Sequence, residues 1–133
     1  MDPIVILDNE FCTLWYHPDT KIIHHQIKKF ITGDAFKELF NTGYDTLVKN
    51  AVIKWFSDDR NMPILNADDG YWAKTDWFPR VKAAGWKHWA KVWNIEYATP
   101  IAKKSLTTSY NGIGINAKLF SDADSAMQWL IDQ

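Results

Sequence analysis

The sequence predicts an α/β fold: a mixed, mostly parallel sheet with an N-terminal β-meander and about four helices. Three observations predict it. The first third of the chain alternates short β-type runs with turn residues, the remainder alternates β runs with segments of helical periodicity, and 47% of the 133 residues are apolar. A chain of this size buries roughly 68% of its extended surface, enough for one core. We therefore expect a single domain over residues 1–133.

Three strands are expected first, over residues 4–7, 12–17 and 21–28. The second is rich in Thr, Trp and Tyr, which suit a pleated surface, and Pro18-Asp19-Thr20 then forms a turn. One face of this hairpin is expected to carry Trp15, His17, Ile22 and His24. The opposite face is expected to carry Leu14, Tyr16, Ile23 and His25.

A helix is expected next, from about Asp34 to Asn50, with Thr32 or Gly33 as its cap. Its apolar stripe falls at helical spacing and consists of Phe36, Leu39, Phe40, Gly43 and Leu47. Residues 51–56 then form a short central strand.

A second helix is expected over residues 67–84, with Asn66 as N-cap and Gly85 as its stop. Asp68 and Asp69 suit its first turn, and Pro79 predicts a kink or break inside it.

The remaining elements continue the alternation. A strand is expected over residues 86–93, a helix from Thr99-Pro100 to Asn111-Gly112, a strand over residues 115–120, and a last helix capped by Ser121. This order implies parallel strands joined by right-handed crossovers.

Composition narrows the function classes. Lys and Arg number 15 and Asp and Glu 16, so a net charge of −1 disfavours nucleic-acid binding. The single cysteine, Cys12, excludes an intrachain disulfide and a Cys-rich zinc site. We find no secretory signal and no apolar run long enough to span a membrane, so a cytoplasmic protein without membrane insertion is expected.

No motif predicts a cofactor, a metal or a catalytic group. The Gly112-x-Gly114 fragment precedes a strand and fails the dinucleotide fingerprint. His24 and His25 are neighbours on a strand and point to opposite faces, so they do not chelate one ion together. We therefore expect a protein that is not an enzyme.

The polar run Ser57-Asp58-Asp59-Arg60-Asn61 follows the predicted central strand. The carboxyl ends of strands in open α/β sheets border the ligand crevice. We expect this run to border the main crevice, with Arg60 near Asp58 or Asp59. It is a candidate for binding a ligand or a partner; a plain polar loop and a catalytic role are the alternatives.

The predicted second helix carries an unexpected apolar patch. At 100° per residue, Trp72, Pro79 and Ala83 lie together on its outer side, flanked by Thr75, Asp76 and Lys82. Trp72, Asp76 and Pro79 are therefore candidates for contact with a protein partner or a second copy of the chain, including a homodimer. The alternative is that Trp72 packs under the loop before the helix.

The stretch Ala51–Asn61, followed by Thr75-Asp76-Trp77-Phe78-Pro79 and Ala84-Gly85-Trp86-Lys87, resembles the STAS domain of anti-sigma-factor antagonists and small bacterial STAS-like or SEC14-like proteins. The resemblance covers most of the chain as topology. It implies a regulatory protein-interaction module switched by phosphorylation of a hydroxyl at a helix start. Here that start reads Asn66-Ala67-Asp68-Asp69-Gly70, so we expect no switch there. The SEC14-like side of the resemblance implies a lipid cavity.

Two functions follow as hypotheses. The first is a non-enzymatic, STAS-like interaction module of the bacterial cytosol. The alternative is a small-molecule or lipid-binding protein that uses a Trp-rich crevice, because the chain has eight tryptophans. A cavity above ~300 Å³ lined by Trp would favour the alternative.

Overall fold

The computed structural model describes residues 2–133; Met1, the first residue of the expected domain, lies outside them. Six strands form one sheet in the order β1-β2-β3-β4-β5-β6. The strands are β1 (Ile4–Asp8), β2 (Cys12–His17), β3 (Ile22–Ile27), β4 (Lys54–Asp58), β5 (His88–Val92) and β6 (Asn116–Phe120). The first three pair antiparallel and the last four pair parallel, which confirms the predicted mixed sheet with its N-terminal meander.

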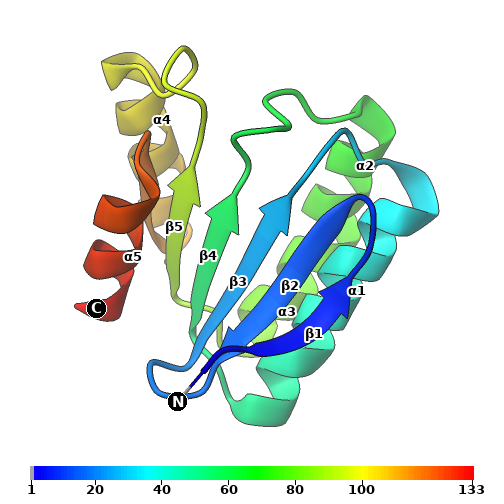
Figure 1. Ribbon diagram of the computed structural model, residues 1–133. Helices are drawn as coiled ribbons and strands as arrows, with labels where there is room; N and C mark the ends of the chain where they lie inside the picture. Colours follow the sequence, from blue (N-terminus) through cyan, green and yellow to red (C-terminus); the bar gives the residue numbers. More distant parts are fainter. Residues whose placement is uncertain (1) are drawn as a thin grey trace.

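Helices cover both faces of the sheet unequally. They are α1 (Gly33–Asn50), α2 (Ala67–Trp72), η1 (Ala73–Trp77), α3 (Phe78–Ala83), α4 (Pro100–Asn111) and α5 (Ala123–Ile131). In Figure 1, α1, α2 and α3 lie behind the sheet, whereas α5 lies in front of it near the C-terminal edge. Since α2, η1 and α3 follow one another without a break, residues 2–133 contain the four helical segments that the sequence predicts.

The β2–β3 hairpin has the predicted register. Trp15 pairs with His24, and Leu14 pairs with His25, so the two expected face sets are both correct. His25 is thereby turned toward the helices that cover the rear face, and His24 toward the opposite face, where it contacts Phe56. The hairpin thus places His25 on one face of the sheet and His24 on the other.

Close packing of α1 on the sheet depends on a glycine. A Cβ at position 43 would lie 2.3 Å from Cη2 of Trp55, a side chain only 1% exposed. Gly43 therefore lets the Trp55 ring sit directly under the helix.

The α1 N-terminus is capped from another helix. Thr32 is the N-cap residue, but its hydroxyl donates to the Asp69 carboxylate at 2.6 Å, and the Gly33 N–H donates to the same group at 3.1 Å. Asp69 is itself buried, and Asn66 caps α2 as predicted by accepting from the Asp69 N–H. A buried acid therefore occupies the helix start where the STAS resemblance implies a hydroxyl.

The helix predicted over residues 67–84, with a kink or break at Pro79, spans Ala67 to Ala83 and is irregular next to that proline. Its middle turn, η1, is a π-helix that ends just before Pro79. Proline lacks the N–H that a continuing α-helix needs, which accounts for an irregular turn at this place.

The π turn changes which side chains face inward. Trp72 and Trp77 are five residues apart and would diverge on an α-helix, but the wider turn brings both toward the core. Trp72 packs edge-to-face on Phe36 at 6.0 Å between ring centroids. Trp72, expected at the centre of an exposed stripe, is therefore half-buried, whereas Pro79 and Ala83 of that stripe are exposed as expected.

The last two helices begin close to where the sequence predicts. Thr99 caps α4 by accepting from the Ala102 N–H. The N-cap of α5 is Asp122, which accepts from the Ser125 N–H, rather than the expected Ser121. Asp122 is favoured over Ser121 as the N-cap because a carboxylate is stabilised by the partial positive charge at a helix N-terminus. None of the helices in residues 2–133 combines the length and apolar character needed to cross a membrane.

Candidate functional site

A cavity of about 710 Å³ lies between the rear face of the sheet and the helices that cover it. Its floor consists of side chains from β3, the end of β4 and β5: His25, Trp55, Ser57, Asp59, Trp89 and Lys91. Its walls come from α1, from α2–η1–α3 and from α4. The cavity thus extends along the rear face of the sheet and reaches the carboxyl ends of the central parallel strands, where α/β sheets commonly bind ligands.

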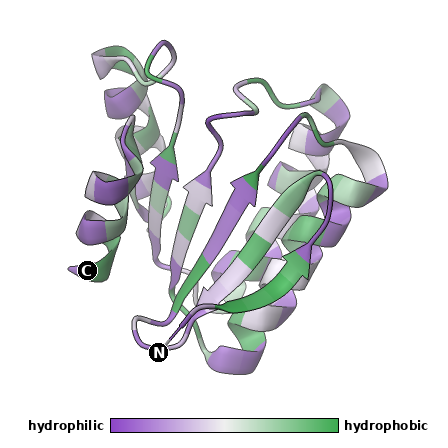
Figure 2. Ribbon diagram, in the orientation of Figure 1, coloured by the Kyte–Doolittle hydropathy of each residue, from purple (hydrophilic) through white to green (hydrophobic). Residues whose placement is uncertain are grey.

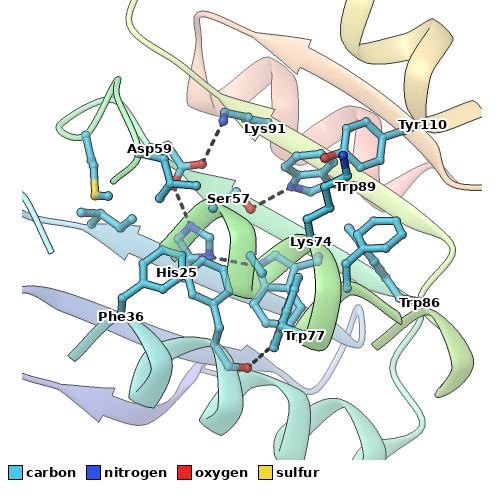
Figure 3. A pocket seen from close by; sticks show the side chains of 18 of the residues that line it. His25, Phe36, Ser57, Asp59, Lys74, Trp77, Trp86, Trp89, Lys91 and Tyr110 are labelled. Carbon is cyan, nitrogen blue, oxygen red and sulfur yellow. Dashed lines mark hydrogen bonds and ion pairs between the residues drawn. The ribbon is translucent and has the colours of Figure 1, made fainter. Parts of the chain in front are cut away.

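Four tryptophans line this cavity: Trp55, Trp77, Trp86 and Trp89. Each indole N–H is already donated within the protein, to His25 Nδ1, to the carbonyls of Phe40 and His88, and to Ser57 Oγ respectively. The four rings therefore offer only their apolar faces and edges to a bound molecule. Figure 3 shows Trp77, Trp86, Trp89 and Tyr110 gathered on one side of the cavity.

Three polar side chains form a row across the cavity floor. His25, Ser57 and Lys91 occupy matching positions on β3, β4 and β5. Because an indole nitrogen only donates, the bond from Trp55 fixes His25 Nδ1 as an acceptor. His25 Nε2 then carries the proton and donates to Asp59 Oδ1 at 2.7 Å. Both ring nitrogens are thus occupied.

Asp59 is held as an anion in the cavity floor. Its side chain is 13% exposed, and Lys91 Nζ lies 3.6 Å from Oδ2. Burial alone would raise the pKa of Asp59, but the interactions with His25 and Lys91 outweigh it and lower that pKa. The carboxylate therefore remains charged at neutral pH.

The groups that remain free to bind are hydrogen-bond donors. Within residues 2–133, the Ser57 hydroxyl accepts from Trp89 but donates to no protein atom. The Lys91 ammonium forms a 3.6 Å ion pair with Asp59 and lies over the Trp93 ring. Lys74 and Tyr110 also line the cavity, and their side chains form no hydrogen bond within residues 2–133. In Figure 3 the Lys74 side chain extends from its helix over the cavity.

The arrangement does not match a serine-hydrolase triad. The Ser57 hydroxyl accepts from Trp89, and both nitrogens of His25 are hydrogen-bonded to other side chains, Nδ1 to Trp55 and Nε2 to Asp59. No general base therefore contacts the serine hydroxyl. No group of three or more His, Cys, Asp or Glu side chains in residues 2–133 is placed to hold a metal ion. What the cavity offers is apolar ring surface with a few donors at one end.

The predicted polar run is divided between the two faces of the sheet. Ser57 and Asp59 line the cavity. Asp58 points to the opposite face, where Arg60 binds it through two hydrogen bonds of 2.7 and 2.9 Å. Asn61 is exposed and does not line the cavity. The run therefore borders the crevice as expected, with Arg60 paired to Asp58, but it is not one cluster.

The residues predicted around Trp72 do not line the cavity. Trp72 is half-buried against Phe36, with the Lys37 ammonium 5.7 Å from its ring centroid. Asp76 is exposed and forms an ion pair with Arg80 at 3.0 Å, and Pro79 is exposed on α3.

Sequence reasoning missed His25, Lys74, Lys91 and Tyr110 as cavity residues. Lys91 had a local signal, because it alternates with Trp89 on β5 and so shares its face of the sheet. His25 had none, since its neighbours Ser57 and Lys91 lie more than thirty residues away in the sequence.

No protein-family profile matches this chain, and neither a curated protein nor a solved structure matches it significantly.

Proposed function

We propose that the protein binds a small organic molecule with a flat, apolar body in the cavity between the sheet and the helices. One observation carries the proposal: a space of about 710 Å³ lined by four tryptophans whose N–H groups are all satisfied. Ligand sites are typically concave, largely apolar and ~300–1,000 Å³ in volume.

The shape of the cavity is fixed before a ligand arrives. Trp77 is held by the Phe40 carbonyl at 2.7 Å, and Trp89 is held by Ser57 at 2.8 Å. The rings also brace one another, with Trp55 and Trp77 edge-to-face at 5.3 Å. Rings that are already ordered lose little conformational entropy when a ligand stacks on them, which favours affinity.

Binding is tested with naphthamide, a neutral probe with a flat ring system. We expect it to quench the intrinsic tryptophan fluorescence at saturating concentration, with calorimetry giving the dissociation constant. Replacing the half-buried wall residue Ala73 by Phe fills part of the cavity and should weaken binding about tenfold or more. Ala83→Phe is the matched control, because Ala83 is exposed on α3 outside the cavity.

Thermal melts of both variants establish that they are folded. If naphthamide binds wild type and a folded Ala73→Phe variant equally, the cavity is not its site and the proposal is wrong.

A STAS-like interaction module is the second candidate, and the edge of the sheet favours it. Strand β1 has one hydrogen-bonded neighbour and exposes Ile4, Val5 and Ile6, with Val5 56% exposed. Figure 2 shows this edge strand as strongly hydrophobic. An exposed apolar edge strand is a template for pairing with another chain, here a second copy of this one.

Sedimentation tests this candidate. If the edge mediates self-association, wild type sediments as a dimer and Val5→Lys, which places a charge on the edge, sediments as a monomer. A monomeric wild type would remove self-association through β1.

A further inference from the structure

We propose that the ligand of this cavity is a small aromatic carboxylate, whose carboxylate is held between Ser57 and Lys91. The inference rests on the proposed function and adds the chemical class of the ligand. It comes from the hydrogen-bonding state and the charge of the side chains that line the cavity.

The polar groups left over in the cavity are of one kind. Ser57 and Lys91 lie beside each other on β4 and β5 with side chains on the same face. Ser57 still has its hydroxyl hydrogen to donate, and Lys91 has its ammonium hydrogens, because its contact with Asp59 is 3.6 Å long. Two adjacent donors, one of them charged, fit two oxygens of a carboxylate.

The cavity also carries a net positive charge. Its charged lining residues are Lys74, Lys91 and Asp59. His25 accepts the Trp55 N–H at its Nδ1 and adds no negative charge to the cavity. Two ammonium groups against one carboxylate leave a charge of +1, which an anionic ligand would neutralise.

Asp59 does not reverse this preference. Its Oδ1 accepts from His25 at 2.7 Å and its Oδ2 is turned to Lys91, so both oxygens are engaged. In Figure 3, Asp59 and Lys91 lie together at one end of the cavity, and Trp77, Trp86 and Tyr110 lie toward the other. A cationic ligand beside Asp59 would also lie beside the Lys91 ammonium, 3.6 Å from the carboxylate.

The aromatic part of the ligand follows from the walls. Beyond the polar end, the space is bounded by Trp77, Trp86, Trp89 and Tyr110, with Trp89 and Tyr110 edge-to-face at 4.8 Å. Such surfaces bind planar rings by stacking and edge contacts. A flat ring bearing one carboxylate matches both ends of the cavity.

The test uses three probes that share a naphthalene ring and differ in charge: naphthoate, naphthamide and naphthylmethylamine. Calorimetry at neutral pH gives their dissociation constants. We expect naphthoate to bind about tenfold or more tightly than naphthamide, and the amine to bind weakest. The preference should fall with rising salt, because it depends on charge.

Variants of two lysines test whether the Lys91 ammonium causes the preference for the carboxylate probe. Lys91→Met removes the ammonium group, which lies 4.7 Å from the centroid of the Trp93 ring, but keeps a long unbranched side chain, and it should abolish the preference for naphthoate. Lys118→Met is the matched control: Lys118 also lies on a strand with its ammonium over an aromatic ring, but it does not line the cavity. Lys91→Arg retains the charge and should retain a preference for the anion.

The outcomes separate the two proposals. Equal affinities for naphthoate and naphthamide, or a preference that survives Lys91→Met in a folded protein, would overturn the carboxylate assignment while leaving the cavity a binding site. Failure of all three probes to bind wild type would overturn the proposed function itself.

Discussion

Replacing Gly43 by Ala tests how rigidly the cavity floor is built. The new Cβ would lie 2.3 Å from Cη2 of Trp55, whereas carbon atoms in contact are ordinarily ~3.5–4.0 Å apart. To restore a contact distance of ~3.5 Å, the ring must therefore move by more than 1 Å. It has little room to do so, because it is 1% exposed and its Nε1 donates to His25 at 3.0 Å.

The size of the effect follows from three contributions. Overpacking a core costs ~1–3 kcal/mol. Losing the Trp55–His25 hydrogen bond costs ~0.5–1.5 kcal/mol. Against these losses, alanine in place of glycine inside a helix stabilises the folded state by ~1 kcal/mol. We expect Gly43→Ala to lower the free energy of unfolding by about 2 kcal/mol.

Urea denaturation followed by circular dichroism measures this change, with the slope against urea concentration compared between variants. Gly70→Ala is the matched control, because Gly70 is also helical but its Cβ would meet only the flexible end of Leu65, at 3.3 Å. It should leave stability unchanged or raise it by up to ~1 kcal/mol. A Gly43→Ala protein as stable as Gly70→Ala would refute the reasoning, since Trp55 would then move freely.

Three further predictions concern other parts of the fold. Burial, together with the charges of neighbouring imidazoles, lowers the pKa of His24 from 6.5 to about 3. Because the unfolded chain binds a proton that the folded chain excludes, the free energy of unfolding should fall as the pH drops below 6.5 toward 3; urea titrations of wild type and His24→Gln measure it. Asp69→Ala removes the acceptor of the Thr32 hydroxyl and should destabilise the protein by ~1–3 kcal/mol in thermal melts. Trp72→Ala loses the packing on Phe36 and should cost about 2 kcal/mol, with an unchanged sedimentation coefficient.

Each of these has an outcome that contradicts it. The same pH dependence in wild type and His24→Gln would mean that another group causes the acid destabilisation. Unchanged melting of Asp69→Ala would show that water replaces the carboxylate at the start of α1. A Trp72→Ala variant that keeps its stability but changes its sedimentation would restore the interface reading of Trp72.

The antiparallel half of the sheet was predictable because its signals are local. A short turn sets the register of β2 and β3, and alternation then decides that Leu14 and His25 share one face. The helix over Gly33–Asn50 was equally accessible, since one apolar stripe at regular spacing specifies both its existence and its buried side.

The irregular helix was not predictable in the same way. A projection at 100° per residue assumes an α-helix throughout, and Pro79 signals an irregularity without saying which kind. With a π turn the direction of every side chain before it changes relative to those after it. That is why Trp72, predicted on the outer side, packs against Phe36 instead.

The candidate site was predicted in part. We expected β4 to end at residue 56, so the run from Ser57 was treated as one loop cluster. The strand in fact continues to Asp58, and alternation sends Ser57 and Asp58 to opposite faces. Ser57 lies beside His25 and Lys91 because β4 lies between β3 and β5 in the sheet. No local sequence pattern specifies that strand order.

The π turn at Ala73–Trp77 has a consequence for how the sequence can vary in length. An extra residue in one helical turn is equivalent to a single-residue insertion, and removing it would restore regular α-helix. The helix after it would then rotate by about 100°, the angle of one residue at 3.6 residues per turn. Trp77 would leave the cavity wall and Val81 would leave the core. Insertions and deletions in proteins that share this cavity should therefore fall in the loops around Ile64 and Ile95, both exposed, and spare the segment from Trp72 to Trp77.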